Sequence, residues 1–190
     1  MGKRRKRKNP ALDAFLDWCE TIVLAVFVVI LMFTFVFRIA HVYGISMQST
    51  LYEGDVLIIS HLFYEPERGD IIVVNSSVLD ETIIKRVIAT EGETVSIDCK
   101  DASVYVNGEK TDEPYISMSS FDTGAFNMND YLASVDRYEY TVPKGCVFVL
   151  GDNRNHSTDS REIGFISNDE IVGRVLFRAV SEQLGTGKVE

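Results

Sequence analysis

The sequence predicts a mostly β protein, in which a partly closed β-domain is tethered by one N-terminal transmembrane helix. Two observations predict this class. Residues 21–37 form an apolar run without a single charge, and from Asp55 onward short runs rich in Val, Ile, Tyr and Phe alternate with turn residues. The length of 190 residues fits one packed domain with a short appendage. Two large domains are therefore not expected.

The apolar run reads TIVLAVFVVILMFTFVF. At about 1.5 Å per residue it would span roughly 25 Å, near the lower limit for a bilayer core about 30 Å thick. Arg38 can extend its charge to the lipid interface, and Trp18 and Tyr43 stand where interfacial aromatic rings are favoured. A buried core helix would show a polar face, and a cleaved secretory signal would end at a small-x-small site. The run shows neither feature, and we predict a transmembrane helix over residues 19–38.

Residues 3–8 are six consecutive basic residues that precede this helix. Positive charge next to a spanning segment is retained in the cytoplasm. We therefore predict a single-pass protein of the cell membrane, with a basic cytoplasmic tail over residues 1–18 and the rest of the chain outside.

The outer part consists, in this prediction, of a β-domain over residues 39–180 and a C-terminal tail over residues 181–190. It is more acidic than the net charge of −9 for the whole chain, because six basic residues lie at the N-terminus. Such a surface argues against nucleic acid as a partner, whereas membrane lipid is expected. Nothing in the sequence fixes the oligomeric state.

The β-domain contains eight runs with the composition of strands. They are Val56 to Ser60, Ile71 to Val74, Thr82 to Thr90, Thr94 to Ile97, Ser103 to Val106, Arg137 to Val142, Cys146 to Leu150 and Val172 to Ala179. Asn107-Gly108 predicts a tight hairpin. Residues 111–136 lack periodicity and are expected to form an insertion that takes no part in chemistry. Cys99 and Cys146 could pair or remain buried thiols.

A first candidate for chemistry is the segment GISMQSTL, residues 44–51. It begins six residues after Arg38, so a nucleophile in it would work close to the bilayer. Ser46 is the candidate. Taken alone this signal is weak, because a serine in a loop is far more often structural than catalytic.

A second candidate is the predicted strand ETIIKRVIAT, in which Lys85 and Arg86 interrupt an apolar run. Neighbouring residues of a strand point to opposite faces, so each cation has apolar neighbours on its own face. Burial lowers the pKa of a lysine from about 10.4 and so allows it to act as a base, whereas arginine keeps its proton. Two ion-paired structural cations are the alternative interpretation.

The third segment, LGDNRNHSTDSREIG, follows directly from an apolar strand. Its side chains can form a polar network that holds others in place. The members of this network are Asp152, Asn153, Arg154, Ser157, Asp159, Ser160 and Arg161.

In their order along the chain and in their residues, the three segments together resemble the type I signal peptidases, a family of membrane-bound Ser/Lys proteases. The resemblance covers about Asp17 to Ala179, leaves the insertion unmatched, and is closest in form to the Gram-positive bacterial branch. It implies a β-domain of the signal peptidase type that is catalytic over residues 39–180. The implied activity is that of a serine endopeptidase, a hydrolase that removes N-terminal signal peptides from exported preproteins. No metal or cofactor is implied.

The resemblance also implies roles for individual residues. Ser46 matches the nucleophile, Lys85 the general base, and Ser157 the serine whose hydroxyl orients that lysine. Asp159 and Arg161 match the pair that stiffens the site.

Further matches concern the surroundings of the site. Arg86 is a candidate partner for Asp159, and Asp152 belongs to the supporting network. Leu51 and Ile84 match positions that line the shallow pockets for the small residues at −1 and −3 of the signal peptide. Gly44 stands where some relatives have a serine that helps to form the oxyanion hole, so one donor is absent here.

Three alternatives remain open on the sequence. His41, His61 or His156 could serve as the base instead of Lys85, as in a Ser-His-Asp arrangement. The chain could be an inactive protease scaffold that assembles surface proteins. It could also resemble the self-cleaving Ser/Lys repressors, although these lack a spanning helix and usually carry a DNA-binding domain.

Overall fold

The computed structural model describes residues 10–98, 103–116 and 137–189. It divides the chain into two compact units, residues 1–37 and 38–190. Each unit is described by itself. Cys99 and residues 117–136 of the predicted insertion lie outside the described residues, and Cys146 carries a free, partly buried thiol.

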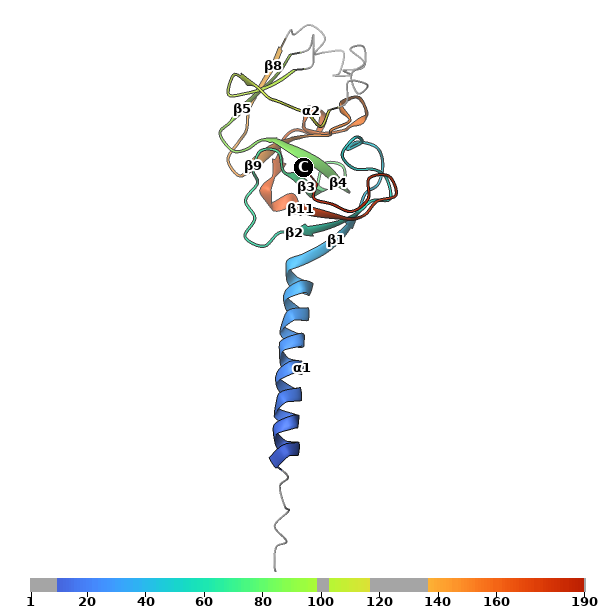
Figure 1. The fold of residues 1–190 in the computed structure, drawn as a ribbon. Helices are drawn as coiled ribbons and strands as arrows, with labels where there is room; N and C mark the ends of the chain where they lie inside the picture. The colour runs from blue at the N-terminus through green and yellow to red at the C-terminus, as the bar shows by residue number, and fades with distance from the viewer. Residues whose placement is uncertain (1–9, 99–102, 117–136, 190) are drawn as a thin grey trace, which may run out of the picture. The chain divides into compact units, whose positions relative to one another are not determined.

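The first unit is formed by helix α1, Pro10–Val36, drawn in blue in Figure 1. It begins earlier than the predicted span, because Pro10 suits a first helical position and good helix formers follow it. The helix is long and apolar enough to cross a membrane, with a mean hydropathy of 2.2 over its most apolar part. Thr21 and Thr34 each donate their hydroxyl to the carbonyl four residues earlier, so both polar groups are satisfied within the helix.

The second unit contains a seven-stranded sheet in the order β1-β2-β11-β3-β4-β9-β10 (Figure 1). Its strands are β1 Phe37–His41, β2 Val56–Ser60, β3 Ile71–Ser76, β4 Glu81–Ala89, β9 Cys146–Leu150, β10 Ile166–Ser167 and β11 Ile171–Val180. Each strand pair with a defined register is antiparallel. The predicted mostly β fold class with one N-terminal apolar helix is confirmed.

A four-stranded sheet in the order β7-β6-β5-β8 completes the unit. Its strands are β5 Thr94–Asp98, β6 Val104–Val106, β7 Glu109–Lys110 and β8 Arg137–Thr141. Asn107 and Gly108 both have positive φ, of 54° and 83°. This is the geometry of the predicted tight hairpin.

All eight predicted strands are present, whereas β1, β7 and β10 were not predicted. Three short helices complete the described elements: η2 Arg154–His156, α2 Ser160–Ile163 and η3 Asn168–Glu170.

Strand β3 shows why the large sheet is apolar on both faces. Ile71 and Val73 pack into a cluster with Met47 and Leu51, whereas Ile72 and Val74 pack into a second cluster on the other side. Alternate residues of a strand face opposite sides, so both faces of β3 are covered. A strand that is covered on both faces has a continuous apolar sequence, as residues 71–74, IIVV, do in β3. The strands that hold the site are therefore held from two sides.

Candidate active site

The segment around Ser46 is a series of turns fixed to the rest of the domain through its backbone. Gly44 has φ of +78°, a conformation that favours glycine. The Asn153 side chain donates to the Ile45 carbonyl at 3.1 Å, and the Asn153 backbone N–H donates to the Ser46 carbonyl at 3.0 Å. Met47 is buried in the core directly after the serine. These contacts fix the position of the Ser46 backbone.

Gly151 lies directly against this segment. A Cβ at position 151 would lie 2.6 Å from the Ser46 carbonyl oxygen and closer still to Ser157 Oγ. Only glycine allows the two chain segments to approach this closely. The glycine that opens the polar segment therefore sets the distance between this segment and the serine.

Lys85 comes from β4 and meets the serine. Its Nζ lies 2.8 Å from Ser46 Oγ, and the lysine is only 3% exposed. Burial lowers the pKa of Lys85, and the positive charge of Arg161 acts in the same direction. The carboxylates of Asp159 and Glu81 oppose this shift. The arrangement is that of a hydroxyl next to an amine that loses its proton more readily than an ordinary lysine.

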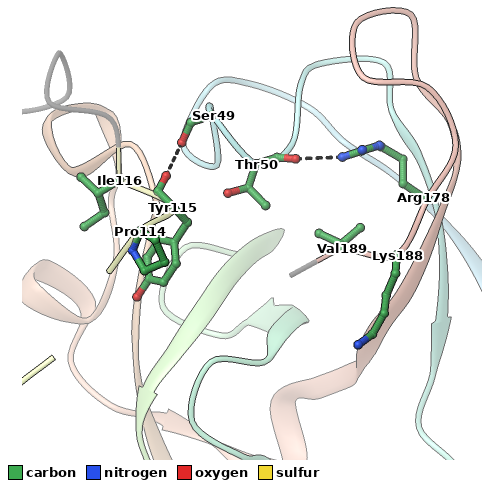
Figure 2. Close-up of a pocket in the computed structure, with 8 residues that line it drawn as sticks. All are labelled: Ser49, Thr50, Pro114, Tyr115, Ile116, Arg178, Lys188 and Val189. Carbon is green, nitrogen blue, oxygen red and sulfur yellow. Dashed lines mark hydrogen bonds between the residues drawn. The ribbon is translucent and has the colours of Figure 1, made fainter. Parts of the chain in front are cut away.

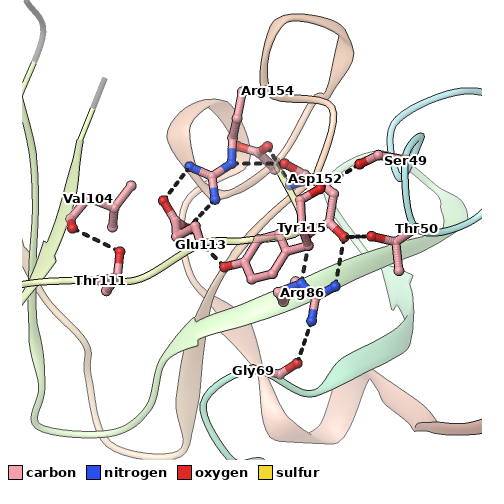
Figure 3. Close-up of polar contacts among 12 residues, drawn as sticks. Ser49, Thr50, Gly69, Arg86, Val104, Thr111, Glu113, Tyr115, Asp152 and Arg154 are labelled. Atoms are coloured by element: carbon pink, nitrogen blue, oxygen red, sulfur yellow. Dashed lines mark hydrogen bonds and ion pairs between the residues drawn. The ribbon is translucent and has the colours of Figure 1, made fainter. Parts of the chain in front are cut away.

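Arg86 occupies the opposite face of β4 and is equally buried. Its Nε and Nη2 donate to the two oxygens of Asp152 at 2.9 and 2.8 Å, and its guanidinium lies 3.8 Å from the centre of the Tyr115 ring (Figure 3). The suggested pairing of Arg86 with Asp159 is wrong. Arg86 lies opposite Leu150 across β4 and β9, which brings Asp152, two residues further on, next to its side chain. Thr50 also donates to Asp152, at 2.5 Å.

Asp159 pairs instead with Arg161. Arg161 Nε and Nη2 donate to its two oxygens at 2.7 and 2.8 Å. Ser157 Oγ donates to the same carboxylate at 2.7 Å, and the Gly151 backbone N–H does so at 2.9 Å. The hydroxyl of Ser157 thus holds Asp159, whereas Lys85 Nζ has its hydrogen bond to Ser46. Ser157, which is expected to orient Lys85, has no hydrogen bond to the lysine among the described residues, and Asp159, to which it donates, acts on Lys85 through its charge.

Residues 113–116 join this support, which the sequence did not predict. Glu113 forms an ion pair with Arg154 and accepts a hydrogen bond from the Tyr115 hydroxyl at 2.9 Å. Ser49, three residues after Ser46, donates to the Tyr115 carbonyl at 2.6 Å (Figure 3). The start of the predicted insertion therefore braces the loop that carries Ser46, a role that no spacing or composition signals.

A groove of about 540 Å³ opens over Ser46 and Lys85. Ile84 and Met47 line it, as do His41 and His156. Leu51, by contrast, is fully buried and is not part of the described lining. Its expected place in a substrate pocket is not supported, because the side chain belongs to the core cluster beneath the groove.

Among the described residues, Lys85 is hydrogen-bonded to Ser46 Oγ and none of the three histidines is. His156 contacts Asn153 Oδ1 through Nδ1 at 3.3 Å, whereas Ser46 Oγ has Lys85 as its partner. His61 lines a different pocket.

A second pocket, of about 370 Å³, lies beside the turn at Ser49 and Thr50 (Figure 2). Arg178 and Lys188 line part of it, and Arg178 donates to the Thr50 carbonyl at 3.0 Å. Its described lining contains neither Ser46 nor Lys85. The contact between Ser46 and Lys85 therefore belongs to the groove and not to this pocket.

Within the described part of the chain, no three His, Cys, Asp or Glu side chains are placed to hold a metal ion.

Comparison with known proteins identifies the family. The model of the family "Signal peptidase, peptidase S26" matches residues 15–180. The chain belongs to this family. As a member of the S26 peptidases it is a serine peptidase and hence a hydrolase, as the resemblance of its three segments implied.

Two curated relatives illustrate the S26 match. Signal peptidase I T of Bacillus subtilis (strain 168) is 36% identical over 179 residues, which cover 92% of this chain and 89% of that protein. Signal peptidase IB of Staphylococcus aureus (strain Mu50) is 34% identical over 172 residues, covering 86% and 88%. A crystal structure of a signal peptidase I from Enterococcus faecalis V583 is 30% identical, with a TM-score of 0.42, and covers 58% of this chain and 97% of that one. The family assignment rests on the sequence matches.

Proposed function

We propose that this chain cuts signal peptides from exported preproteins with Ser46 as nucleophile and Lys85 as general base. The observation that carries the proposal is the 2.8 Å contact between Ser46 Oγ and the Nζ of a lysine that is 3% exposed. A hydroxyl is a weak nucleophile until an adjacent base takes its proton, and burial gives Lys85 the lowered pKa that a base needs. Membership of the S26 family and signal peptidase I relatives matched over most of their length support the same activity.

The proposed reaction is acyl transfer in two halves. Neutral Lys85 takes the proton from Ser46 Oγ as this oxygen attacks the scissile carbonyl, and the resulting ammonium then protonates the departing amine. Water next attacks the ester on Ser46 and gives its proton to Lys85, which returns the proton to Ser46 as the carboxylate leaves. The Ser46 backbone N–H is the proposed first donor of the oxyanion hole, and Gly44 brings no side-chain donor.

The groove offers an open strand edge for the substrate. Strand β3 pairs with β4 from Glu81 to Arg86, whereas β9 pairs with β4 only from Arg86 to Ala89. Within the described strands, residues 81–85 therefore lack a partner on the side of β9, and all five line the groove. An extended peptide that adds to this edge would gain main-chain hydrogen bonds and place its scissile bond beside Lys85.

The supporting residues act, in this proposal, through the two reacting groups. Asp159 and Arg161 set the charge around Lys85, and Ser157 acts by holding Asp159. Asp152, held by Arg86, steadies the Ser46 loop through Thr50. Ile84 contributes to the surface that accepts the small side chains of the substrate.

The S26 relatives and helix α1 together indicate membrane anchoring. We propose in addition that residues 1–18 lie in the cytoplasm, that residues 19–38 span the bilayer, and that a catalytic domain over residues 39–180 and a tail over residues 181–190 lie outside. Protease added to intact cells without their wall should then remove an epitope placed after Glu190 and spare one placed before Met1. The reverse pattern would contradict this orientation.

The activity is tested with the detergent-solubilised full-length protein and a labelled preprotein. The wild type should release a product whose new N-terminus lies after a small residue, Ser46→Ala should release none, and Ser46→Cys should retain some activity. Lys85→Arg should be inactive because arginine does not lose its proton, whereas the exposed control Lys144→Arg should be unaffected. Turnover by Lys85→Arg near that of the wild type would end the proposal.

A further inference from the structure

The groove contains one acidic side chain, and the proposed reaction does not use it. Glu81 lies at the start of β4, four residues before Lys85, and its side chain is exposed to the groove. Among the described residues that line the groove it is the one acidic residue, and the other charged or titratable side chains are Arg38, His41, Tyr43, Lys85 and His156. No hydrogen bond or ion pair with another described residue engages its carboxylate. Glu81 is thus free to meet a ligand.

The position of Glu81 relative to Lys85 follows from strand geometry. Residues 81, 83 and 85 of β4 point to the same face. At about 3.3 Å per residue, the backbones of Glu81 and Lys85 lie about 13 Å apart along the strand. The two side chains also interact through their charges, since the negative charge of Glu81 raises the pKa of Lys85 and so opposes the lowering by burial.

A substrate paired with the open edge of β4 has the same rise per residue. If its residue −1 lies opposite Lys85, the residue four places away lies opposite Glu81. Depending on the direction of the substrate, this is residue −5 or residue +4. Directly opposed side chains of paired strands are about 5 Å apart at their Cβ atoms, within reach of an ion pair.

We infer that Glu81 is a specificity-determining residue that favours a lysine or arginine side chain of the substrate four residues from the one that carries the scissile carbonyl. The inference rests on the proposed function, because it takes the scissile bond to lie at Ser46 and Lys85. It names a charge preference in addition to the small residues at −1 and −3. A substrate with an acidic residue at that place is disfavoured by the same carboxylate.

The test compares peptides cleaved by the full-length protein in detergent. One series carries Lys, Gln or Glu at −5, and a second series carries the same three residues at +4. An exposed ion pair contributes about 0.2–1 kcal/mol, so Lys should exceed Gln in kcat/KM by up to about fivefold in one series, and Gln should exceed Glu similarly. Because Glu81 also influences Lys85, each comparison is made between substrates within one variant at one pH.

Three variants separate the carboxylate from other causes. Glu81→Gln should bring the Lys-to-Glu ratio to about one, and Glu81→Lys should invert it. Asp80→Asn removes the neighbouring exposed acid, which does not line the groove, and should keep the wild-type ratio. In high salt the wild-type ratio should decrease.

Equal ratios in the wild type and in Glu81→Gln, in both series, would overturn the inference. This outcome is distinct from failure of the proposed function, because cleavage of the Gln peptides by the wild type and its loss in Ser46→Ala are measured in the same assay. If the wild type cleaves none of the peptides, the proposed function and the inference fall together.

Discussion

Substitution of Gly151 by alanine tests how closely the polar segment approaches the nucleophile. The added Cβ would lie 2.6 Å from the Ser46 carbonyl oxygen and 2.6 Å from Ser157 Cβ. Neither neighbour can turn away freely, because the first is backbone and the Ser157 hydroxyl is held by buried Asp159. The clash must be relieved by a shift of the segment that carries Ser46.

The expected size of the effect follows from the crowding. Overpacking of a well-filled interior costs about 1–3 kcal/mol, which at about 3 °C per kcal/mol lowers Tm by about 3–9 °C for a domain of this size. A displacement of about 1 Å at a reacting group costs on the order of 100-fold in rate. Gly151→Ala should therefore lose about 100-fold in kcat/KM at temperatures where the variant is still folded.

The assay measures preprotein cleavage and thermal unfolding of the same samples. Gly187→Ala is the matched control, because a Cβ at position 187 meets nothing within 4 Å, and its stability should stay within about 0.5 kcal/mol of the wild type. A Gly151→Ala variant with unchanged kcat/KM and Tm would refute the proposed contact between the two segments.

Variants at two further positions, Asp159 and Tyr115, test the surroundings of the buried cations. Asp159→Asn removes a carboxylate that raises the pKa of Lys85 and leaves the positive charge of Arg161, which lowers it. The pH range over which kcat/KM rises with increasing pH should therefore move to lower pH. A move of this range to higher pH would contradict the assignment. The same variant should lose about 3–5 kcal/mol of stability in chemical denaturation, because it breaks a buried ion pair. Tyr115→Leu should destabilise the protein by about 1–2 kcal/mol more than Tyr115→Phe, which keeps the ring over Arg86; equal stabilities would show that the stacking contributes nothing.

The strands and the two cations could be predicted because their signals are local. Val- and Ile-rich runs between turn residues located eight strands to within a few residues. Lys85 and Arg86, each with apolar neighbours on its own face, predicted two buried cations, and both are 3% exposed. Strands of two residues, such as β7 and β10, carry no periodicity and could not be found in this way.

The partners of the cations depend on contacts between distant segments. Arg86 pairs with Asp152 and not with Asp159 because of the register of β4 against β9. This register cannot be derived from the sequence. Leu51 is apolar, and its residue type alone does not distinguish a position in the wall of a pocket from a position in the core beneath that pocket. Tyr115 was assigned to an insertion without a role, because nothing local signals a ring that stacks on a guanidinium from another strand.

The proposed mechanism requires Lys85 to be a neutral amine at the pH of the reaction. It is tested most directly by NMR titration of the 13Cε signals of lysine in the full-length Ser46→Ala protein, with Lys85→Met used to assign the signal. Lys85 should titrate below the ordinary lysine value of about 10.4, because burial lowers its pKa. A Lys85 signal that titrates together with the bulk of the lysines would contradict it.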